Sequence, residues 1–283
     1  MKTRIITGII MACVMIPLVI LSGWYYTAFV CILSYIAGHE VLNMMQIEEV
    51  KFKKLKYIAP LWNVLTVIAA ATEPNLVLPI VLIVCITYCA LCVVNKKFNI
   101  NSTIKMVFVY FYTGLTFSFI YNLRTPFAEG YFNVGLYRLL LLCIFVTFTD
   151  MGAYTFGLLF GKRKLCPEIS PKKTIEGAIG GLVCGIIGGV LFYLLISKTV
   201  LHYSLLNIPS NWHIVFEILV VILIAGLISI ATQIGDLVAS KLKRHYGIKD
   251  YGKIFPGHGG VMDRFDSMIF AGALFVALLA FFM

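Results

Sequence analysis

The feature that most constrains this chain is a series of apolar runs, each close to the length of a membrane span. A transmembrane helix needs about 20 mostly apolar residues. We therefore expect an all-α, polytopic integral membrane protein with about nine transmembrane helices, the first retained rather than cleaved as a signal peptide. The nine runs are Ile5–Ser22, Trp24–Leu42, Tyr57–Ala71, Leu76–Val94, Ile104–Leu123, Val134–Phe160, Ile175–Ser197, Ile214–Gly235 and Ser267–Met283.

Composition supports this class and excludes several others. Hydrophobic residues make up 60% of the chain and charged residues 13%, against about 25% charged in an ordinary soluble domain. A soluble protein could not shield so much apolar surface from water, and disordered chains are poor in apolar residues. The 8 cysteines among 283 residues are too sparse for a secreted disulfide scaffold.

The distribution of basic residues predicts the orientation. With the N-terminus in the cytoplasm, 20 of the 23 Lys and Arg lie on the cytoplasmic side, and only Arg124, Arg138 and Lys198 lie on the other. The positive-inside rule favours this arrangement, with the C-terminus outside. It also accounts for the net charge of +10 without a nucleic-acid partner.

Three cysteines have a spacing that is also found in iron–sulfur cluster sites. Cys85, Cys89 and Cys92 spell C-x3-C-x2-C, a spacing that holds iron–sulfur clusters in radical enzymes. Here they lie in the middle of an apolar run without polar neighbours. On a helix these spacings place them on one face, and free cysteine packs as a small hydrophobe. We interpret them as packing residues.

One acidic residue lies within an apolar stretch. Asp150 follows the apolar residues 139–149 and precedes another apolar segment. An ionisable group at such a depth is costly and marks a functional site by default. The alternative is an interfacial position at which Asp150 caps a break in the helix.

The segment 161–181 combines prolines with lysines. Pro167 and Pro171 are incompatible with a continuous helix. We expect Ser170 to cap the helix that follows, with Pro171 at its first position. Lys172 and Lys173 would then lie at a helix N-terminus, which is a good phosphate site. Ordinary positive-inside charge is the alternative for these lysines.

Glycines recur every four residues in the span that follows. Gly177, Gly181, Gly185 and Gly189 fall on one face of the expected helix. Small residues at this spacing let helix backbones approach closely in lipid. The pattern predicts tight packing of this helix against a neighbour.

The densest group of charged residues lies between Asp236 and Asp266, where ten of them occur. Asp236 closes the eighth apolar run, and Asp263 and Asp266 share a face in the first turn of the last helix, near its positive end. Carboxylate oxygens close to Lys and Arg are typical of a Mg²⁺ site that binds phosphates. Zinc at His258 is disfavoured because no cysteine or second histidine lies nearby. A solvated basic loop is the alternative.

These residues resemble the signature of the phosphatidate cytidylyltransferase (CDP-diacylglycerol synthase) family, with no departure from its pattern over 240–266. Residues 167–177 and Asp150 with its neighbours also resemble the family, whereas the first half is similar only in being a string of apolar helices. The signature residues are Ser240-Lys241-Leu242-Lys243-Arg244, Lys249-Asp250, Gly252, Pro256, His258-Gly259-Gly260-Val261 and Asp263-Arg264-Phe265-Asp266.

The resemblance implies the reaction of CTP with phosphatidate to give CDP-diacylglycerol and pyrophosphate. Asp236, Asp263 and Asp266 are expected to hold one or two Mg²⁺ ions, with Asp150 as a further ligand, and Lys249 joins the first three as a catalytic residue. The expected substrate-binding residues are Ser170, Lys172, Lys173, Arg244, Asp250, His258, Gly259, Gly260 and Arg264.

The expected architecture is a single membrane domain, 1–283, with an apolar helical half at 1–133 and a catalytic half at 134–283. Its expected partners are CTP, phosphatidate and the lipid bilayer, with no nucleic acid, and a homodimer is left open. The expected location is the cell membrane, with the active site on the cytoplasmic side.

Three other classes of function remain open. Another CTP-using lipid enzyme, such as a polyprenol kinase or a CDP-archaeol synthase, would share the membrane body, and the kinase would transfer the γ-phosphate. A secondary transporter would place paired acidic residues at mid-membrane and show internal repeats, whereas the charges here cluster at one face. A structural scaffold would need no metal site.

Overall fold

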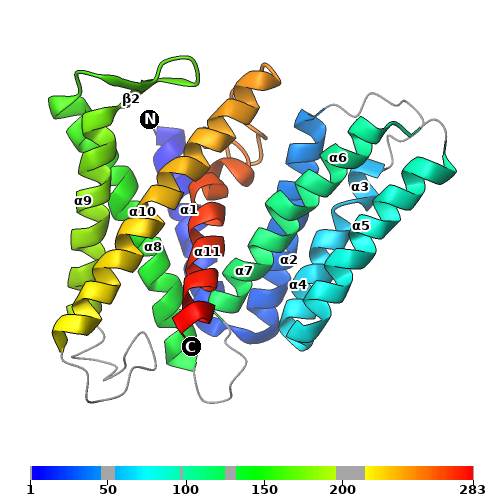
Figure 1. The fold of residues 1–283 in the computed structure, drawn as a ribbon, viewed down its shortest axis with the longest axis horizontal. Coiled ribbons are helices and arrows are strands. Elements are labelled where there is room, and N and C mark those ends of the chain that lie inside the picture. The colour runs from blue at the N-terminus through cyan, green and yellow to red at the C-terminus, as the bar shows by residue number, and fades with distance from the viewer. Residues whose placement is uncertain (1, 46–54, 96–97, 125–131, 196–213, 283) are drawn as a thin grey trace. The chain divides into compact units, whose positions relative to one another are not determined.

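The computed structural model describes residues 2–45, 55–95, 98–124, 132–195 and 214–282 (Figure 1). Contacts between residues divide the chain into two compact units. Unit 1 contains Met1–Phe127 and His245–Phe265, and unit 2 contains Ala128–Arg244 and Asp266–Met283. The segment 245–265, which carries most of the signature motif, is therefore grouped with the N-terminal helices.

Unit 1 contains a series of helices. The segments α6, η3 and α7 follow one another without a break and form one span that contains a π-helical turn, η3. The helices of unit 1 are α1 (Lys2–Leu21), α2 (Gly23–Met44), α3 (Leu55–Ile58), α4 (Leu61–Thr72), η2 (Pro74–Leu76), α5 (Val77–Val94), α6 (Ile100–Val109), η3 (Tyr110–Leu115) and α7 (Thr116–Arg124).

A buried asparagine links three of these segments. The Asn63 side-chain amide on α4 donates to the Ser34 carbonyl of α2 at 3.1 Å and to the Thr113 hydroxyl of η3 at 2.9 Å. Polar groups inside a membrane protein stabilise helix packing when they bond across helices in this way. These bonds hold α2, α4 and η3 together within unit 1.

Arg124, expected on the outer side, is buried at the end of α7. Its Nε donates to the Val19 carbonyl at 2.8 Å and its Nη2 donates to the Ile20 carbonyl at 3.2 Å. The last carbonyls of a helix have no partner within the helix, and a cation there is favourable. Arg124 therefore caps the C-terminal end of α1.

Unit 2 consists of long helices and one antiparallel hairpin, in which Lys164 pairs with Thr174 and Cys166 pairs with Ser170. Helices α8 and α9 run side by side, and the hairpin lies at one end of them (Figure 1). The elements are α8 (Phe132–Phe160), β1 (Lys164–Cys166), β2 (Ser170–Thr174), α9 (Ile175–Phe192), α10 (Ile214–His245) and α11 (Met262–Phe282), whose first turn belongs to unit 1.

The predicted close packing along the glycine face is confirmed. A Cβ atom on Gly181 would lie 2.8 Å from the Thr149 carbonyl oxygen of α8, and one on Gly185 would overlap the Thr149 hydroxyl. The same hydroxyl donates to the Ser229 hydroxyl of α10 at 2.9 Å. Glycine is required here because any side chain would separate α9 from α8.

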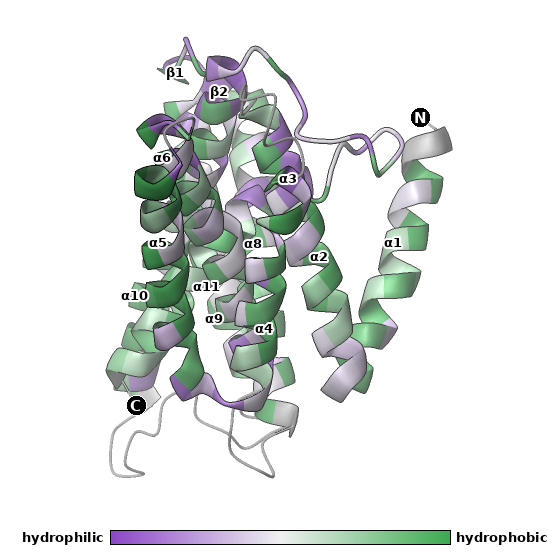
Figure 2. Cartoon of the chain, turned by 90° about the vertical axis from the view of Figure 1, so that its right-hand side faces the viewer, coloured by the Kyte–Doolittle hydropathy of each residue, from purple (hydrophilic) through white to green (hydrophobic). Residues whose placement is uncertain are grey.

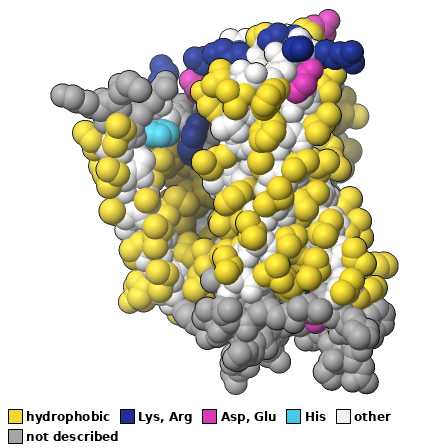
Figure 3. All heavy atoms as spheres, turned by 90° about the vertical axis from the view of Figure 1, so that its left-hand side faces the viewer, with side chains coloured by type: hydrophobic (Ala, Val, Ile, Leu, Met, Phe, Trp, Pro, Cys, Tyr) yellow, Lys and Arg dark blue, Asp and Glu magenta, His cyan; other side chains and the backbone are white. Residues whose placement is uncertain are grey.

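The structure confirms an all-α polytopic membrane protein. Among the described residues, 8 helices are long and apolar enough to cross a membrane, and the apolar part of α1, Ile5–Leu21, is shorter. Hydrophobic residues cover the lengths of the helices, and hydrophilic residues gather toward their ends (Figure 2). In the space-filling view, Lys and Arg side chains gather at the end of unit 2 that carries the hairpin (Figure 3).

Two local predictions for the segment 161–181 were wrong. Ser170 does not cap a helix, and Lys172 and Lys173 do not lie at a helix N-terminus, because residues 170–174 form strand β2. The α9 cap is Thr174, whose hydroxyl accepts from the Gly177 N–H at 3.1 Å. Helix α10 continues past Gly235 to His245, because the chain contains only helix-compatible residues until Gly247, whose φ of 68° ends the helix.

Candidate active site

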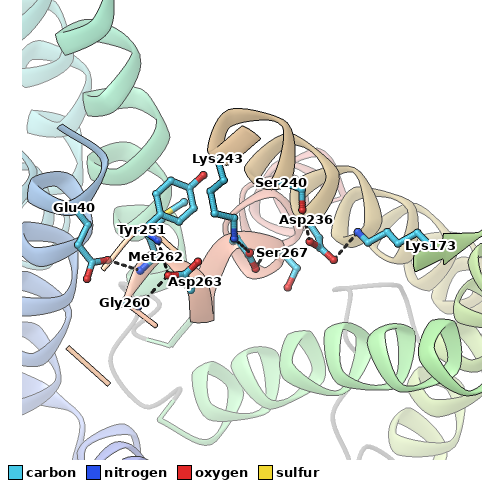
Figure 4. Close-up of polar contacts among 11 residues, drawn as sticks. Glu40, Lys173, Asp236, Ser240, Lys243, Tyr251, Gly260, Met262, Asp263 and Ser267 are labelled. Atoms are coloured by element: carbon cyan, nitrogen blue, oxygen red, sulfur yellow. Dashed lines mark hydrogen bonds and ion pairs between the residues drawn. The ribbon is translucent and has the colours of Figure 1, made fainter. Parts of the chain in front are cut away.

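The signature loop of unit 1, residues 246–261, is tied to the first turn of α11 by Asp263. One carboxylate oxygen, Oδ2, accepts from the Tyr251 N–H at 2.8 Å and from the Gly260 N–H at 2.9 Å (Figure 4). Asp263 is buried, and hydrogen bonds from backbone N–H groups stabilise a buried carboxylate. The structure therefore shows Asp263 joining two separate points of this loop, while its expected role as a metal ligand stays a prediction.

Glu40 on α2 is a site residue that the sequence analysis missed. Its Oε1 accepts from the Val261 N–H at 3.1 Å and its Oε2 accepts from the Met262 N–H at 2.9 Å. Only 4% of the residue is exposed. The signal was available: Glu40 lies near the end of an apolar run, and the argument applied to Asp150 applies equally to it.

A tight turn gives the signature loop its shape. The Phe255 N–H donates to the Gly259 carbonyl at 2.8 Å, and the His258 N–H donates back to the Phe255 carbonyl at 2.9 Å. Gly257 and Gly259 have φ values of 77° and 86°, which favour glycine. Glycine at these two positions thus allows the turn to form.

The loop encloses a basic pocket of about 600 Å³. Its cationic side chains belong to Lys249, Lys253 and Arg264, and Asp250 and His258 also line it. The Nδ1 atom of His258 is buried and has no hydrogen-bond partner in the described part of the chain. Three cations and an imidazole in one concave site fit a ligand rich in phosphate oxygens.

Unit 2 contains a second polar cluster, formed by four elements at the end that carries the hairpin. The Lys173 ammonium of β2 lies 2.6 Å from Asp236 Oδ2 on α10, and the Ser240 hydroxyl lies 3.4 Å from Asp236 Oδ1 (Figure 4). On α11, Asp266 Oδ2 lies 3.7 Å from the Lys243 ammonium. The cluster thus contains two pairs of a carboxylate with an ammonium group.

Asp150 belongs to this second cluster. It lies on α8, ten residues before the end of that helix, and its carboxylate is hydrogen-bonded to the Ser267 side chain. Asp236 and Lys173 both interact electrostatically with the Asp150 carboxyl group. The structure thus brings Asp150, Asp236 and Asp266 to one end of unit 2, whereas Asp263, the other expected ligand, belongs to unit 1.

The predicted phosphate-binding lysines differ in their surroundings. Side chains alternate between the two faces of a strand, so Lys173 faces Asp236 while its neighbour Lys172 is exposed to solvent. Glu176 at the start of α9 accepts from the Lys162 N–H at 3.0 Å and fixes the base of the hairpin. Ser170 is partly buried in β2, and Arg244 is exposed near the end of α10.

The carboxylates of unit 2 suit Mg²⁺ in chemistry and number. Within the described ranges, no group of three or more His, Cys, Asp and Glu side chains converges as a complete metal cage. Mg²⁺ does not need one, because it is usually bound by one or two carboxylates together with substrate phosphates and water. Asp150 and Asp236, which interact electrostatically, supply such oxygens.

Known proteins are similar to this chain over its whole length. The cytidylyltransferase family profile matches residues 2–282. A protein named phosphatidate cytidylyltransferase from Staphylococcus saprophyticus is 34% identical over 284 residues, covering 99% of both chains. One of the same name from Bacillus subtilis is 34% identical over 289 residues, covering 100% of this chain and 98% of the relative. The chain described here belongs to the cytidylyltransferase family.

Proposed function

We propose that this protein transfers CMP from CTP to phosphatidate in a membrane, giving CDP-diacylglycerol and pyrophosphate. The observation that carries the proposal is the match of residues 2–282 to the cytidylyltransferase family, with full-length relatives named phosphatidate cytidylyltransferase. The two polar clusters at the ends of membrane-spanning helices support it, because the reaction joins a lipid to a polyanionic nucleotide.

The chemistry requires alignment and charge neutralisation. A phosphate oxygen of phosphatidate attacks the α-phosphorus of CTP, and the bond from that phosphorus to the bridging oxygen of the β-phosphate breaks. The electron pair leaves with pyrophosphate. Because the attacking oxygen is already anionic near neutral pH, no strong general base is needed. The protein's main contributions are therefore positioning and electrostatic stabilisation.

We assign the basic pocket of unit 1 to phosphate binding. Lys249, Lys253 and Arg264 would neutralise the triphosphate of CTP and the pyrophosphate that forms from it. His258 would donate to a phosphate oxygen. Asp250 also lines this pocket, and its charge would orient the neighbouring lysines rather than bind the anion directly.

We assign Mg²⁺ binding to the carboxylates of unit 2. Asp236 would be the principal ligand, with Asp150 and Asp266 near it, and Lys173 would move from Asp236 to a substrate phosphate. These carboxylates would hold Mg²⁺, whose positive charge would stabilise the negative charge that develops on the phosphate groups. The proposal holds for one ion or two.

The protein is integral to a membrane, and we propose the bacterial cell membrane with the site on its cytoplasmic side. The relatives named above are bacterial. CTP is a cytoplasmic metabolite, and the predicted orientation places 20 of the 23 Lys and Arg on that side.

Position-specific labelling of CTP tests the reaction. Purified protein in detergent should transfer label from [α-³²P]CTP to the lipid product and release label from [γ-³²P]CTP as pyrophosphate. EDTA should abolish the transfer and Mg²⁺ should restore it. Transfer of the γ-label to a lipid would instead show a kinase, and full activity in metal-free buffer would contradict the Mg²⁺ assignment.

Two variants of α10 sharpen the metal assignment. Asp236→Asn should lower turnover about 10²–10³-fold, as loss of one strong transition-state interaction does. The matched control is Glu217→Gln, which changes an acidic residue on the same helix whose Oε2 accepts from the Tyr193 hydroxyl at 2.8 Å. The control should keep wild-type turnover, and equal losses in both variants would point to a general effect on α10.

A further inference from the structure

Glu40 and the signature loop lie far apart in sequence but are joined by two hydrogen bonds. Glu40 comes from the N-terminal half, while its two donors, the N–H groups of Val261 and Met262, lie 221 and 222 residues later. Each carboxylate oxygen takes one N–H. Both donors lie where α11 begins, and a carboxylate at the positive end of a helix is stabilised by its dipole.

The loop is built around this carboxylate. A Cβ atom on Gly252 or on Gly260 would overlap the Glu40 carboxylate group. The backbone therefore passes directly against the carboxylate at two places, one before the 255–259 turn and one after it. Glycine is needed at both positions because of where Glu40 lies.

Glu40 and Asp263 both bind the backbone of the loop. Asp263 accepts hydrogen bonds from the N–H groups of Tyr251 and Gly260. Glu40 accepts from the next two N–H groups, those of Val261 and Met262. Four backbone donors of one short segment are thus bound by two acidic side chains. Burying two carboxylates near each other is costly unless each is well hydrogen-bonded, so this arrangement fixes the loop in a single conformation.

We propose that Glu40 is a positioning residue for the reaction: it acts through the signature loop by fixing the backbone that carries Lys249, His258 and Arg264 into the phosphate pocket. It touches neither the substrate nor a metal ion. Two experiments test this proposal. The measurement of activity, called the activity arm, rests on the proposed function. The measurement of backbone hydrogen exchange, called the backbone arm, does not.

The backbone arm uses hydrogen–deuterium exchange on purified full-length protein in detergent. Glu40→Gln replaces one carboxylate oxygen by an NH₂ group, which cannot accept from a backbone N–H. Peptides covering 251–262 should exchange at least about tenfold faster, since each lost hydrogen bond weakens protection. The matched control is Glu73→Gln, an exposed residue of unit 1 bonded to Asn75, which should leave these peptides unchanged.

The activity arm separates positioning from general destabilisation. Glu40→Gln should raise the KM for CTP at least about fivefold while the KM for phosphatidate changes less than about twofold, because only the phosphate pocket loses its shape. Glu73→Gln should change neither. Unchanged exchange together with unchanged KM for CTP would overturn the proposal. Faster exchange in every helix with equal losses for both substrates would overturn it too.

A double-mutant cycle keeps the test decisive if Glu40→Gln folds poorly. Gly252→Ala places a methyl group against the Glu40 carboxylate and should lower kcat/KM for CTP at least about tenfold in the wild-type background. In a Glu40→Ala background the space is free, so the same change should cost less than about threefold. Equal costs in both backgrounds would show that Glu40 does not contact the loop as proposed.

A wild-type protein that makes no CDP-diacylglycerol would refute the proposed function but leave the exchange result standing.

Discussion

At the scale of single residues, adjacent lysines on β2 have different surroundings. Lys173 lies 2.6 Å from Asp236, whereas Lys172 points away into solvent. The two side chains are chemically identical and adjacent in sequence. An account based only on total charge would predict equal effects on activity for the two lysines. The structure predicts unequal effects, because Lys173 is paired with a carboxylate and Lys172 is exposed.

Substitution of each lysine tests this difference. Lys173→Gln should lower kcat/KM about 10²-fold, because it removes a cation from the carboxylate cluster at which phosphates are proposed to react. Lys172→Gln should cost less than about threefold, since a single exposed charge contributes little. Steady-state rates at saturating Mg²⁺ measure both. A Lys172→Gln defect as large as that of Lys173→Gln would contradict the assignment of Lys173 to the site.

Sequence reasoning identified candidate site residues but not their contacts. Asp150 and Asp236 could be predicted because an ionisable side chain at the end of an apolar run is unusual. Glu40 met the same condition but was missed, and its partners are backbone N–H groups that no sequence pattern reveals. For the same reason, the hydrogen bonds of Asp263 to Tyr251 and Gly260 could not be predicted.

At the scale of elements, the close approach of α8 and α9 depends on glycine. Gly185→Ala would push a methyl group into the Thr149 hydroxyl and should destabilise the protein by about 1–3 kcal/mol, as overpacking does. Gly226→Ala on α10 is the control, because its Cβ would meet only Ile186 Cδ1 at 3.7 Å. The temperature at which folded protein is lost in detergent should fall for Gly185→Ala and stay level or rise for Gly226→Ala, because alanine favours helix. Equal melting temperatures would show that the α8–α9 contact tolerates a methyl group.

The apolar lengths of the helices were predictable and their polar ends were not. Hydrophobic runs located every long helix, because a membrane span has a fixed minimum length. The apolar run 214–235 gives only the membrane-spanning part of α10, which continues to His245, because a helix extends into water when the residues that follow favour helix. The hairpin at 164–174 was missed, since two prolines indicate only that a helix is absent.

At the scale of the whole molecule, the orientation in the membrane stays a prediction with a direct test. A cysteine placed in the Lys249–Lys253 loop of a cysteine-free variant should be protected from an impermeant thiol reagent in intact cells. A cysteine appended after Met283 should be labelled. Permeabilised cells, in which both must react, provide the control. The reverse pattern would overturn the orientation and remove access to cytoplasmic CTP.

Helix α10 also indicates how the two substrates meet. From Ile214 to Asp236 the helix rises about 33 Å, close to the hydrocarbon thickness of about 30 Å, and it then continues to His245. Asp236 would therefore lie level with the lipid headgroups. Phosphatidate would reach it by diffusing within the plane of the membrane, without leaving its leaflet. CTP would arrive from the aqueous solution. Turnover should consequently follow the surface density of phosphatidate in the bilayer rather than its bulk concentration.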